Sequence, residues 1–355
     1  MLKKLFNFFI YIIVTNLIFL SIAKTETVEK LYINSDKEEL WEDITKAYLD
    51  PLSIKTGLKF ELVLNPNLDN LENMVNQGKC NFHVIELEIG DFILAVERKL
   101  LQEINYSIVD YNNLVANIHK KPNGYEFLSY SEVIAYKVGQ FPNGGPKNMA
   151  DFWNTDKYPG PRTLKDDVVG NLEFALEADG VDSSEVYEVL ATSSGVERAF
   201  KKLDELKPHI VKFWTSESEP IQMLSEGKVT VAIARNGNLE KIKNAGLDIF
   251  YTFQDGNLNS AFYSIPASCS KDSARVAAIY LNAWNQPEWV IEWVKLVPNL
   301  TFTSGIEDEL SKNYDHLLPN NKKNLEIQFK TNWAFWSANF KKLNEKWKKW
   351  RYIEE

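Results

Sequence analysis

The sequence predicts an α/β protein of two lobes, each lobe a mixed, mainly parallel sheet flanked by helices. Short strand patterns alternate with helical patterns through most of the chain, which is typical of parallel sheets covered by helices. The 355 residues, 45% hydrophobic and 25% charged, suffice for two separate cores. Because no long Gly/Ser-rich linker divides the chain, we expect short crossings between the lobes.

The first half alternates strands with helices. Strands are expected at residues 31–34, 59–64 and 82–88. Apolar residues recur every four positions at Leu40, Ile44 and Tyr48, which predicts a helix. We expect this helix to end at Pro51, because proline disrupts a helix interior. Asp91 is expected to cap the helix that follows the third strand.

The second half repeats this alternation. A helical run at residues 172–176 is expected to end at Gly180, as in a C-terminal glycine cap. A later helix is expected to begin at Pro220 and to end at Gly227, and residues 229–233 then alternate as a strand. Ligands of such sheets bind beyond the carboxyl ends of the strands, so two facing lobes predict one cleft between two sets of strand ends.

The N-terminus has the order of a Sec signal peptide. Lys3 and Lys4 precede an almost unbroken apolar run at residues 5–20, and Ser21-Ile22-Ala23 ends it with small residues. The run is slightly short for a transmembrane helix, although an uncleaved anchor is the alternative. We expect residues 1–23 to be removed as a signal peptide and the mature chain to be periplasmic.

Composition excludes several classes of protein. A net charge of −9 argues against a partner nucleic acid, whose phosphates require clustered cations. Cys80 and Cys269 do not form a CxxC pair, so a disulfide is permitted but not decided. The four histidines lack ligand spacing, and we expect no metal and no cofactor. No GxSxG, GxxxxGK[ST] or HExxH motif is present, so we do not expect an enzyme.

A series of short segments runs in order from about Leu31 to the C-terminus. They are residues 141–153, 158–160, 172–181, 186–192, 195–204 and 207–210, the strand before Asn236-Gly237, the Ile265-Pro266 pair and the Trp-rich end around Phe335-Trp336. In order and spacing, the chain resembles the spermidine/putrescine-binding periplasmic proteins of ABC transporters, which are extracellular solute-binding proteins.

The resemblance implies a periplasmic-binding-protein fold, also called a venus flytrap, whose lobes close on a small polar ligand. It implies delivery of that ligand to the permease subunits of an ABC importer, and we expect a monomer. Lobe 1 is expected to contain residues 24–131 and 262–305, and lobe 2 residues 132–261 and 306–355. The crossings are then near Ser131, Ala261 and Gly305.

The resemblance also suggests ligand-binding residues. They are Asp36, Glu88, Ser131, Asp167, Arg235, Asn259 and Trp336, although core packing is the alternative role for Trp336. The chain departs from the polyamine-binding pattern at several positions. Arg235 replaces an aromatic residue before Asn-Gly, Asn259 and Ala261 stand where an aromatic residue and an aspartate are expected, and Gly170 replaces an acidic residue.

The charges of Arg235 and Glu88 do not decide the chemical class of the ligand. A cation at Arg235 repels a polyamine and suits a carboxylate or phosphonate, unless Arg235 pairs with an acidic residue of the protein itself. Glu88 shares a strand face with Glu86 and is a candidate to hold an amine, or to be that partner. The resemblance favours a polyamine such as putrescine or spermidine, whereas the residues favour a zwitterion or anion, such as an amino acid, an ω-amino acid or an aminophosphonate.

Overall fold

The structure is a computed structural model that describes residues 28–110, 120–297, 303, 305–310, 314–319 and 321–352. The expected signal peptide lies outside the described residues. Within them, the strands are β1 (Lys30–Asn34), β2 (Lys59–Val63), β3 (Val84–Glu88), β4 (Tyr125–Lys137), β5 (Arg162–Lys165), β6 (Ile210–Trp214), β7 (Val231–Arg235), β8 (Ile249–Ser264) and β9 (Phe329–Lys330). Strands and helices alternate as the sequence predicted, most closely at β1, β2 and β3.

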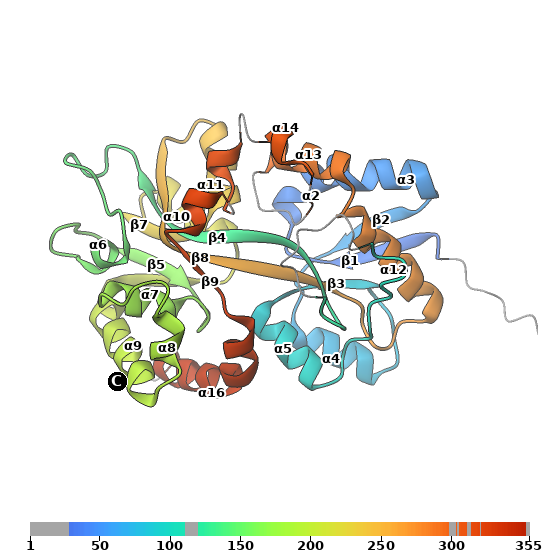
Figure 1. Cartoon of the computed structure of the whole chain (residues 1–355), viewed down its shortest axis with the longest axis horizontal. Coiled ribbons are helices and arrows are strands. Elements are labelled where there is room, and N and C mark those ends of the chain that lie inside the picture. Colours follow the sequence, from blue (N-terminus) through green and yellow to red (C-terminus); the bar gives the residue numbers. More distant parts are fainter. Residues whose placement is uncertain are drawn as a thin grey trace, which may run out of the picture.

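The helices cover both ends of the molecule, as Figure 1 shows. They are η1 (Glu38–Leu40), α2 (Trp41–Ile44), η2 (Thr45–Leu49), α3 (Asp50–Thr56), α4 (Leu68–Asn76), α5 (Ile89–Glu97), α6 (Met149–Trp153), α7 (Asn171–Ala178), α8 (Val186–Leu190), α9 (Ser193–Leu206), η3 (Lys207–His209), α10 (Ser218–Ser225), α11 (Asn236–Asn244), α12 (Lys271–Ala283), α13 (Pro287–Leu296), α14 (Glu307–Leu310), η4 (Asp315–Leu317), α15 (Lys322–Leu325) and α16 (Trp333–Tyr352). In the part of the chain that is described, no helix is long and apolar enough to cross a membrane.

The strands form one hydrogen-bonded sheet in the order β2-β1-β3-β8-β4-β7-β5-β6, with β9 beside β8. At one end β1, β2 and β3 are parallel, and at the other end β5, β6 and β7 are parallel. The antiparallel strands β4 and β8 are long and run through both ends, so they join the two parallel sets (Figure 1).

The register of β4 and β8 brings the carboxyl ends of both parallel sets together. Glu88, the last residue of β3, pairs with Ala261, which pairs with Leu128 in β4. Arg235, the last residue of β7, pairs with Glu132 a few residues further along β4. Because β3 and β7 end at neighbouring positions of the same strand, the polar groups that follow them face one another.

Apolar packing stabilises each end and also links the two ends. One buried cluster contains Leu31 of β1 and Trp293 of α13 and includes Ile306, whereas another runs from Phe92 of α5 through Trp336 of α16 to the helices beside β5. Gly90 of α5 lies so close to α16 that an added Cβ atom would be 2.4 Å from the Phe340 ring. Helix α16 therefore packs directly against α5 while it also contacts the other half.

Two details of the predicted helices were wrong. The helix after β1 continues through Pro51 to Thr56, because the π-helical turn η2 precedes the proline, which then lies in the first turn of α3 where no hydrogen-bonded N–H is needed. Asp91 does not cap α5, because the N-cap is Glu88 and Asp91 lies in the first turn. The turn after α7 does contain Gly180 with a φ of 86°, as expected for a glycine cap.

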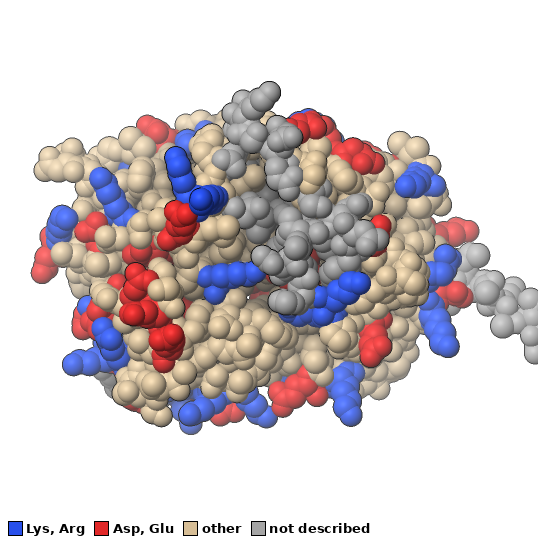
Figure 2. All heavy atoms as spheres, viewed as in Figure 1, with Lys and Arg blue, Asp and Glu red and all other residues tan. Residues whose placement is uncertain are grey.

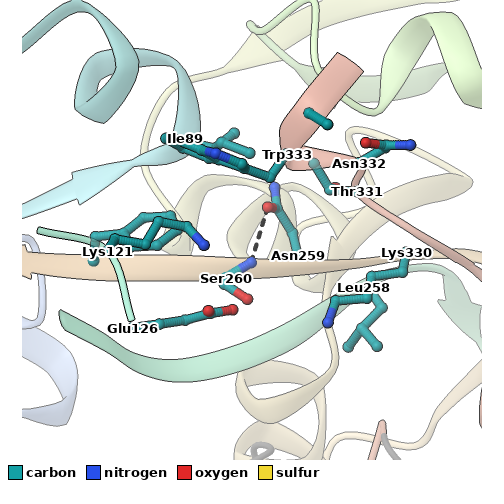
Figure 3. Close-up of a pocket in the computed structure, with 12 residues that line it drawn as sticks. Ile89, Lys121, Glu126, Leu258, Asn259, Ser260, Lys330, Thr331, Asn332 and Trp333 are labelled. Atoms are coloured by element: carbon teal, nitrogen blue, oxygen red, sulfur yellow. Dashed lines mark hydrogen bonds between the residues drawn. The ribbon is translucent and has the colours of Figure 1, made fainter. Parts of the chain in front are cut away.

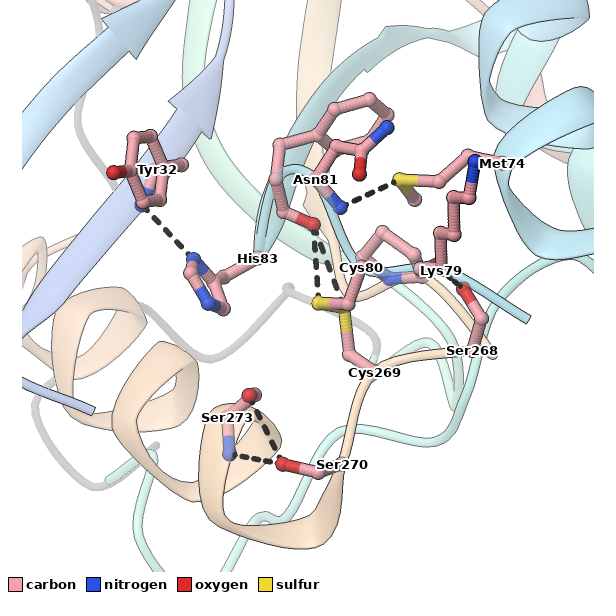
Figure 4. Close-up of a disulfide and its surroundings, with 12 residues drawn as sticks. Tyr32, Met74, Lys79, Cys80, Asn81, His83, Ser268, Cys269, Ser270 and Ser273 are labelled. Carbon is pink, nitrogen blue, oxygen red and sulfur yellow. Dashed lines mark hydrogen bonds between the residues drawn. A yellow bond between two sulfur atoms is a disulfide. The ribbon is translucent and has the colours of Figure 1, made fainter. Parts of the chain in front are cut away.

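A disulfide joins Cys80 to Cys269 across 189 residues of the chain. It connects the loop before β3 to the loop after β8, at the end of β3 that is remote from Glu88 (Figure 4). Next to it, the Ser268 hydroxyl donates to the Lys79 carbonyl at 2.5 Å, and the Tyr32 N–H donates to His83 Nδ1 at 2.9 Å. The disulfide therefore links the loop before β3, in the first parallel set, covalently to the loop after β8.

We expect the double variant Cys80→Ser/Cys269→Ser to lose about 2–5 kcal/mol of unfolding free energy, because it removes a constraint on a long loop of the unfolded chain. Urea denaturation of the oxidised wild type and the variant measures this difference. Dithiothreitol should lower the stability of the wild type alone, and equal midpoints for the two oxidised proteins would contradict the expectation.

Candidate functional site

A cavity of about 190 Å³ lies where the two sets of strand ends meet. Its walls are Asp36, Pro66, Glu86, Leu87, Glu88, Asp91, Lys165, Trp214, Thr215, Glu217 and Arg235. On the outer face seen in Figure 2, acidic and basic side chains are interspersed, so charge is not segregated there. In the cavity, by contrast, five carboxylates and two cations face a single small space.

The ends of five strands supply these side chains. Asp36 follows β1, and Glu88 ends β3. Lys165 ends β5, Glu217 follows β6 and Arg235 ends β7. The first two come from one parallel set and the last three from the other, so the cavity has one wall from each half of the molecule. This is the position at which α/β sheets bind ligands.

Arg235 connects the two walls. Its side chain is 6% exposed, and its Nη2 lies 2.5 Å from Glu88 Oε1 across the cavity, while Nη1 pairs with Glu217. The guanidinium carbon lies 3.9 Å from the centre of the Tyr130 ring, a cation–π contact. Burial opposes the charge, but Glu217 and Glu88 outweigh it and raise the pKa of Arg235 well above its usual value.

Glu88 is held as a carboxylate by groups from both halves. The Tyr130 hydroxyl donates a hydrogen bond to its Oε2, and Lys165 Nζ lies 3.5 Å from the same oxygen. Burial alone raises the pKa of a carboxyl group, but Arg235 and Lys165 lower the pKa of Glu88 well below its usual value. Glu88 is therefore charged at neutral pH and acts as the partner of Arg235.

Lys165 and Lys37 add two further centres of positive charge. Lys165 Nζ is 3.5 Å from an oxygen of each of Glu88, Glu132 and Asp167. Burial disfavours its charge, yet these carboxylates raise the pKa of Lys165. Lys37, behind the cavity wall, is 2.9 Å from Glu86 Oε1 and also pairs with Glu217. Arg235, Lys165 and Lys37 thus each have a carboxylate partner.

Two carboxylates in the cavity are left without such a partner. Neither Asp36 nor Asp91 forms an ion pair or a side-chain hydrogen bond with another described residue. Burial and the nearby Glu86 raise the pKa of Asp36 to about 6. Burial and the nearby Glu88 raise the pKa of Asp91. A cationic group that entered the cavity would relieve the repulsion at both positions.

The structure brings together some of the residues expected from the sequence and separates others. Asp36, Glu88 and Arg235 share the cavity, and Asp167 is joined to it through Lys165. The remaining three expected residues lie elsewhere. Ser131 is buried in β4, and its hydroxyl donates to Gln328 at 2.5 Å. Asn259 lines a different cavity, and Trp336 is fully buried, with its Nε1 donating to Glu173 at 2.8 Å.

Lys165 and Glu217 were missed by the sequence analysis. Lys165 is the last residue of a short strand, and a search of every expected strand for a charged final residue would have found it. Glu217 lies in the turn after β6 and has no such local mark. Its importance comes from Lys37, which lies 180 residues away in the chain.

The two-walled fold with a charged cavity at the meeting strand ends is that of a venus-flytrap solute-binding protein. A model of the bacterial extracellular solute-binding proteins matches residues 55–320, and the chain belongs to this family. The chain is 27% identical over 287 residues to the gamma-aminobutyric acid-binding protein of Pseudomonas aeruginosa, which covers 81% of this chain and 80% of that protein.

Two solved structures share the fold. The PBP MotA of A. tumefaciens B6, in complex with glucopine, superposes with a TM-score of 0.83 at 24% identity, over 91% of this chain and 99% of that one. The spermidine/putrescine ABC transporter substrate-binding protein PotD of Streptococcus pneumoniae superposes with a TM-score of 0.66 at 16% identity, over 91% and 99%. The resemblance and the fold class predicted from the sequence are confirmed.

The family fixes the general role. The protein is a substrate-binding component of an ABC importer, which binds a small solute and works with the permease subunits; it is not an enzyme. The relatives differ in the ligand that their names give, which includes gamma-aminobutyric acid, glucopine and spermidine or putrescine. The family does not decide between these.

We expect Glu217→Gln to lower the unfolding free energy by about 3 kcal/mol, because it breaks the buried ion pairs of Glu217 with Lys37 and Arg235. Each of these cations keeps one other carboxylate, Glu86 or Glu88. Glu72→Gln is the matched control, since among the described residues Glu72 pairs only with Arg98, at the surface, and its loss should cost less than about 1 kcal/mol. Urea denaturation compares the two variants, and equal losses would show that the cavity network does not stabilise the fold.

Proposed function

We propose that the protein captures a small solute with both an amine and a carboxylate, such as an ω-amino acid, in the cavity between its two halves. One observation carries this proposal. The cavity has unpartnered carboxylates at Asp36 and Asp91 and, on the opposite wall, the cations Arg235 and Lys165. Charges of both signs therefore face a solute that enters.

The amine is expected to bind beside Asp36 and Asp91. Asp36 follows β1 and Asp91 lies in the first turn of α5, so both belong to the wall formed by the first parallel set. An ammonium group placed between them gains charge-assisted hydrogen bonds and offsets the burial that now raises the pKa of both carboxyl groups. Trp214 also lines the cavity, but it is only 1% exposed and its indole N–H donates to the Ile233 carbonyl, so it offers little apolar surface.

The carboxylate is expected to bind Arg235. The guanidinium now pairs with Glu88 and Glu217, so an incoming carboxylate must share or displace one of them. Lys165 can hold a displaced Glu88, because its Nζ is already 3.5 Å from Glu88 Oε2. Arginine suits this role because its planar fork forms two parallel hydrogen bonds with a carboxylate.

The size of the cavity favours a short solute. Its volume of about 190 Å³ lies below the roughly 300–1,000 Å³ of typical small-molecule pockets. An ω-amino acid with a few methylene groups is of this order, whereas a long polyamine requires more space. The P. aeruginosa relative, which is named for gamma-aminobutyric acid, supports the same class of ligand.

A short diamine is the second candidate. Five carboxylates against two cations leave an excess of negative charge in the cavity, and a molecule with two ammonium groups would neutralise more of it than a zwitterion. The PotD fold relative, a spermidine/putrescine-binding protein by name, is consistent with this candidate. Arg235 argues against it, because a second ammonium group would have to approach a guanidinium.

We further propose that the chain is exported by the leader at residues 1–23 and acts in the periplasm. The lobes are proposed to be residues 24–131 with 262–305 and residues 132–261 with 306–355. A register shift in β4 between Glu132 and Ile134 supports the first limit. Ile306 and Leu310, by contrast, pack with residues of the proposed lobe 1, which favours a last limit after Leu310. Closure about this irregular stretch of β4 would bring Arg235 to Glu88.

We expect calorimetry to rank three probes in the order γ-aminobutyrate, 1,4-diaminobutane and butanoate. The first carries both charges, the second lacks the carboxylate and the third lacks the amine. In Arg235→Ala, γ-aminobutyrate should bind about 2–5 kcal/mol more weakly, as expected when one partner of a buried charge pair is truncated. The affinity for 1,4-diaminobutane should be unchanged or higher.

Arg198→Ala is the control, because it removes an arginine that pairs with Asp179 on the surface. It should leave the affinities for all three probes unchanged. Unimpaired binding of γ-aminobutyrate by Arg235→Ala would rule out the carboxylate site. Tight binding of 1,4-diaminobutane without binding of γ-aminobutyrate would establish the second candidate instead.

Binding of an amine should also weaken in acid. Because the pKa of Asp36 is raised to about 6 when the two walls face each other, most of its carboxyl group is protonated at pH 5, and an ammonium ligand should bind several-fold more weakly there than at pH 7.5. The contribution of Asp36 to the free energy of unfolding changes in the opposite direction. Because its carboxyl pKa is raised in the folded state, this contribution grows as the pH falls. Calorimetry of Asp36→Asn at both pH values should show weak binding that no longer changes with pH over this range.

A further inference from the structure

A second cavity, of about 290 Å³, lies beside the middle of β8. It is lined by Ile89, Lys121, Glu126, Leu258, Asn259, Ser260, Phe262, Lys330, Thr331, Asn332, Trp333 and Ala334. None of these residues lines the cavity at the strand ends. It is the larger of the two, and it contains Asn259, which the sequence analysis had assigned to the cleft.

This cavity has one carboxylate, Glu126, and two lysines, Lys121 and Lys330, and among the described residues Glu126 forms an ion pair with neither lysine. Glu126 is buried, with 9% of the residue exposed, and makes no hydrogen bond or ion pair with another described residue. Lys121 places its ammonium group 4.9 Å from the centre of the Trp333 ring and 5.8 Å from that of Phe262. Figure 3 shows both side chains with their charged ends directed toward Ser260.

Burial makes both charges costly. An unpaired carboxylate in a buried position loses its hydration without compensation. Lys121 is partly buried, and burial lowers its pKa although Glu126 opposes this effect. The aromatic rings of Trp333 and Phe262 contact the Lys121 ammonium group and partly compensate its burial. Glu126 therefore lacks a cationic partner among the described residues, whereas Lys121 has aromatic rings but no carboxylate as a partner.

Neutral polar groups of the cavity are also available. The Asn259 residue is 3% exposed and its Oδ1 accepts from the Ser260 N–H at 2.8 Å, while its amide nitrogen donates to no described group. Helix α16 begins at Trp333, so the positive end of a 20-residue helix is close to this space. Donors thus lie on the side of Lys121 and Asn259, and an acceptor lies at Glu126.

We propose that this cavity is a second binding site, for a small amino acid zwitterion whose ammonium group pairs with Glu126 and whose carboxylate pairs with Lys121 and the amide of Asn259. The rings of Trp333 and Phe262 contact the carbon chain. One molecule of this class pairs with Glu126 and with a lysine at once, which neither a simple amine nor a simple carboxylate does. The site does not depend on the ligand proposed for the cleft.

Calorimetry with glycine, β-alanine and γ-aminobutyrate tests the site. We expect at least one of these probes to show a binding event that Glu126→Gln weakens at least tenfold and that Arg235→Ala leaves within twofold. Lys121→Met should weaken the same event, because it keeps the apolar stem on Trp333 and removes the charge. Glu103→Gln, which changes an exposed carboxylate outside both cavities, should change nothing.

The outcomes are distinct. If Glu126→Gln weakens no binding event although its melting temperature shows that it is folded, the cavity binds no amino acid and the proposal is wrong, whereas the cleft proposal stands. If Glu126→Gln and Arg235→Ala abolish the same single event, there is one site and not two. If only the Glu126-dependent event is seen, the second site is supported and the proposed cleft ligand is wrong.

Discussion

The pairing of Arg235 with Glu88 and Glu217 is the contact on which the candidate site depends. A buried guanidinium is costly unless carboxylates surround it, and its two partners come from different ends of the sheet. Glu88 ends β3 in one parallel set, whereas Glu217 follows β6 in the other. The cavity therefore exists in this form only while the two sets of strand ends lie against each other.

Different forces stabilise the halves and join them. Apolar clusters and the disulfide between Cys80 and Cys269 stabilise structure away from the cleft. Around the cavity at the strand ends the contacts between the halves are mostly ionic, and Lys241 adds another by pairing with Asp43 at 2.8 Å, whereas α5 and α16 add an apolar contact between the halves. Ionic contacts at a surface that can be rehydrated are weaker and more sensitive to salt than buried apolar contacts.

The charges also explain how one fold can serve different solutes. An aromatic residue at the end of β7 would leave the carboxylates of the cavity free for amines, whereas Arg235 engages two of them and adds a positive wall. On the proposed function, a single residue at this strand end changes the sign of the charge that the cavity accepts there. The backbone does not need to change, which agrees with the varied ligands named for proteins of this fold.

The sequence by itself determined the alternation of strands and helices, the glycine cap at Gly180, and the placement of Glu88 and Arg235 at strand ends, because these follow from local periodicity and from backbone preferences. It could not show that the helix passes Pro51, since a π-helical turn makes room for it. Only the tertiary structure decided that Lys165 and Glu217 belong to the site and that Asn259 lines another cavity. The reason is physical: ion pairs form between segments that are far apart in the chain, and local sequence carries no record of which charges folding brings together.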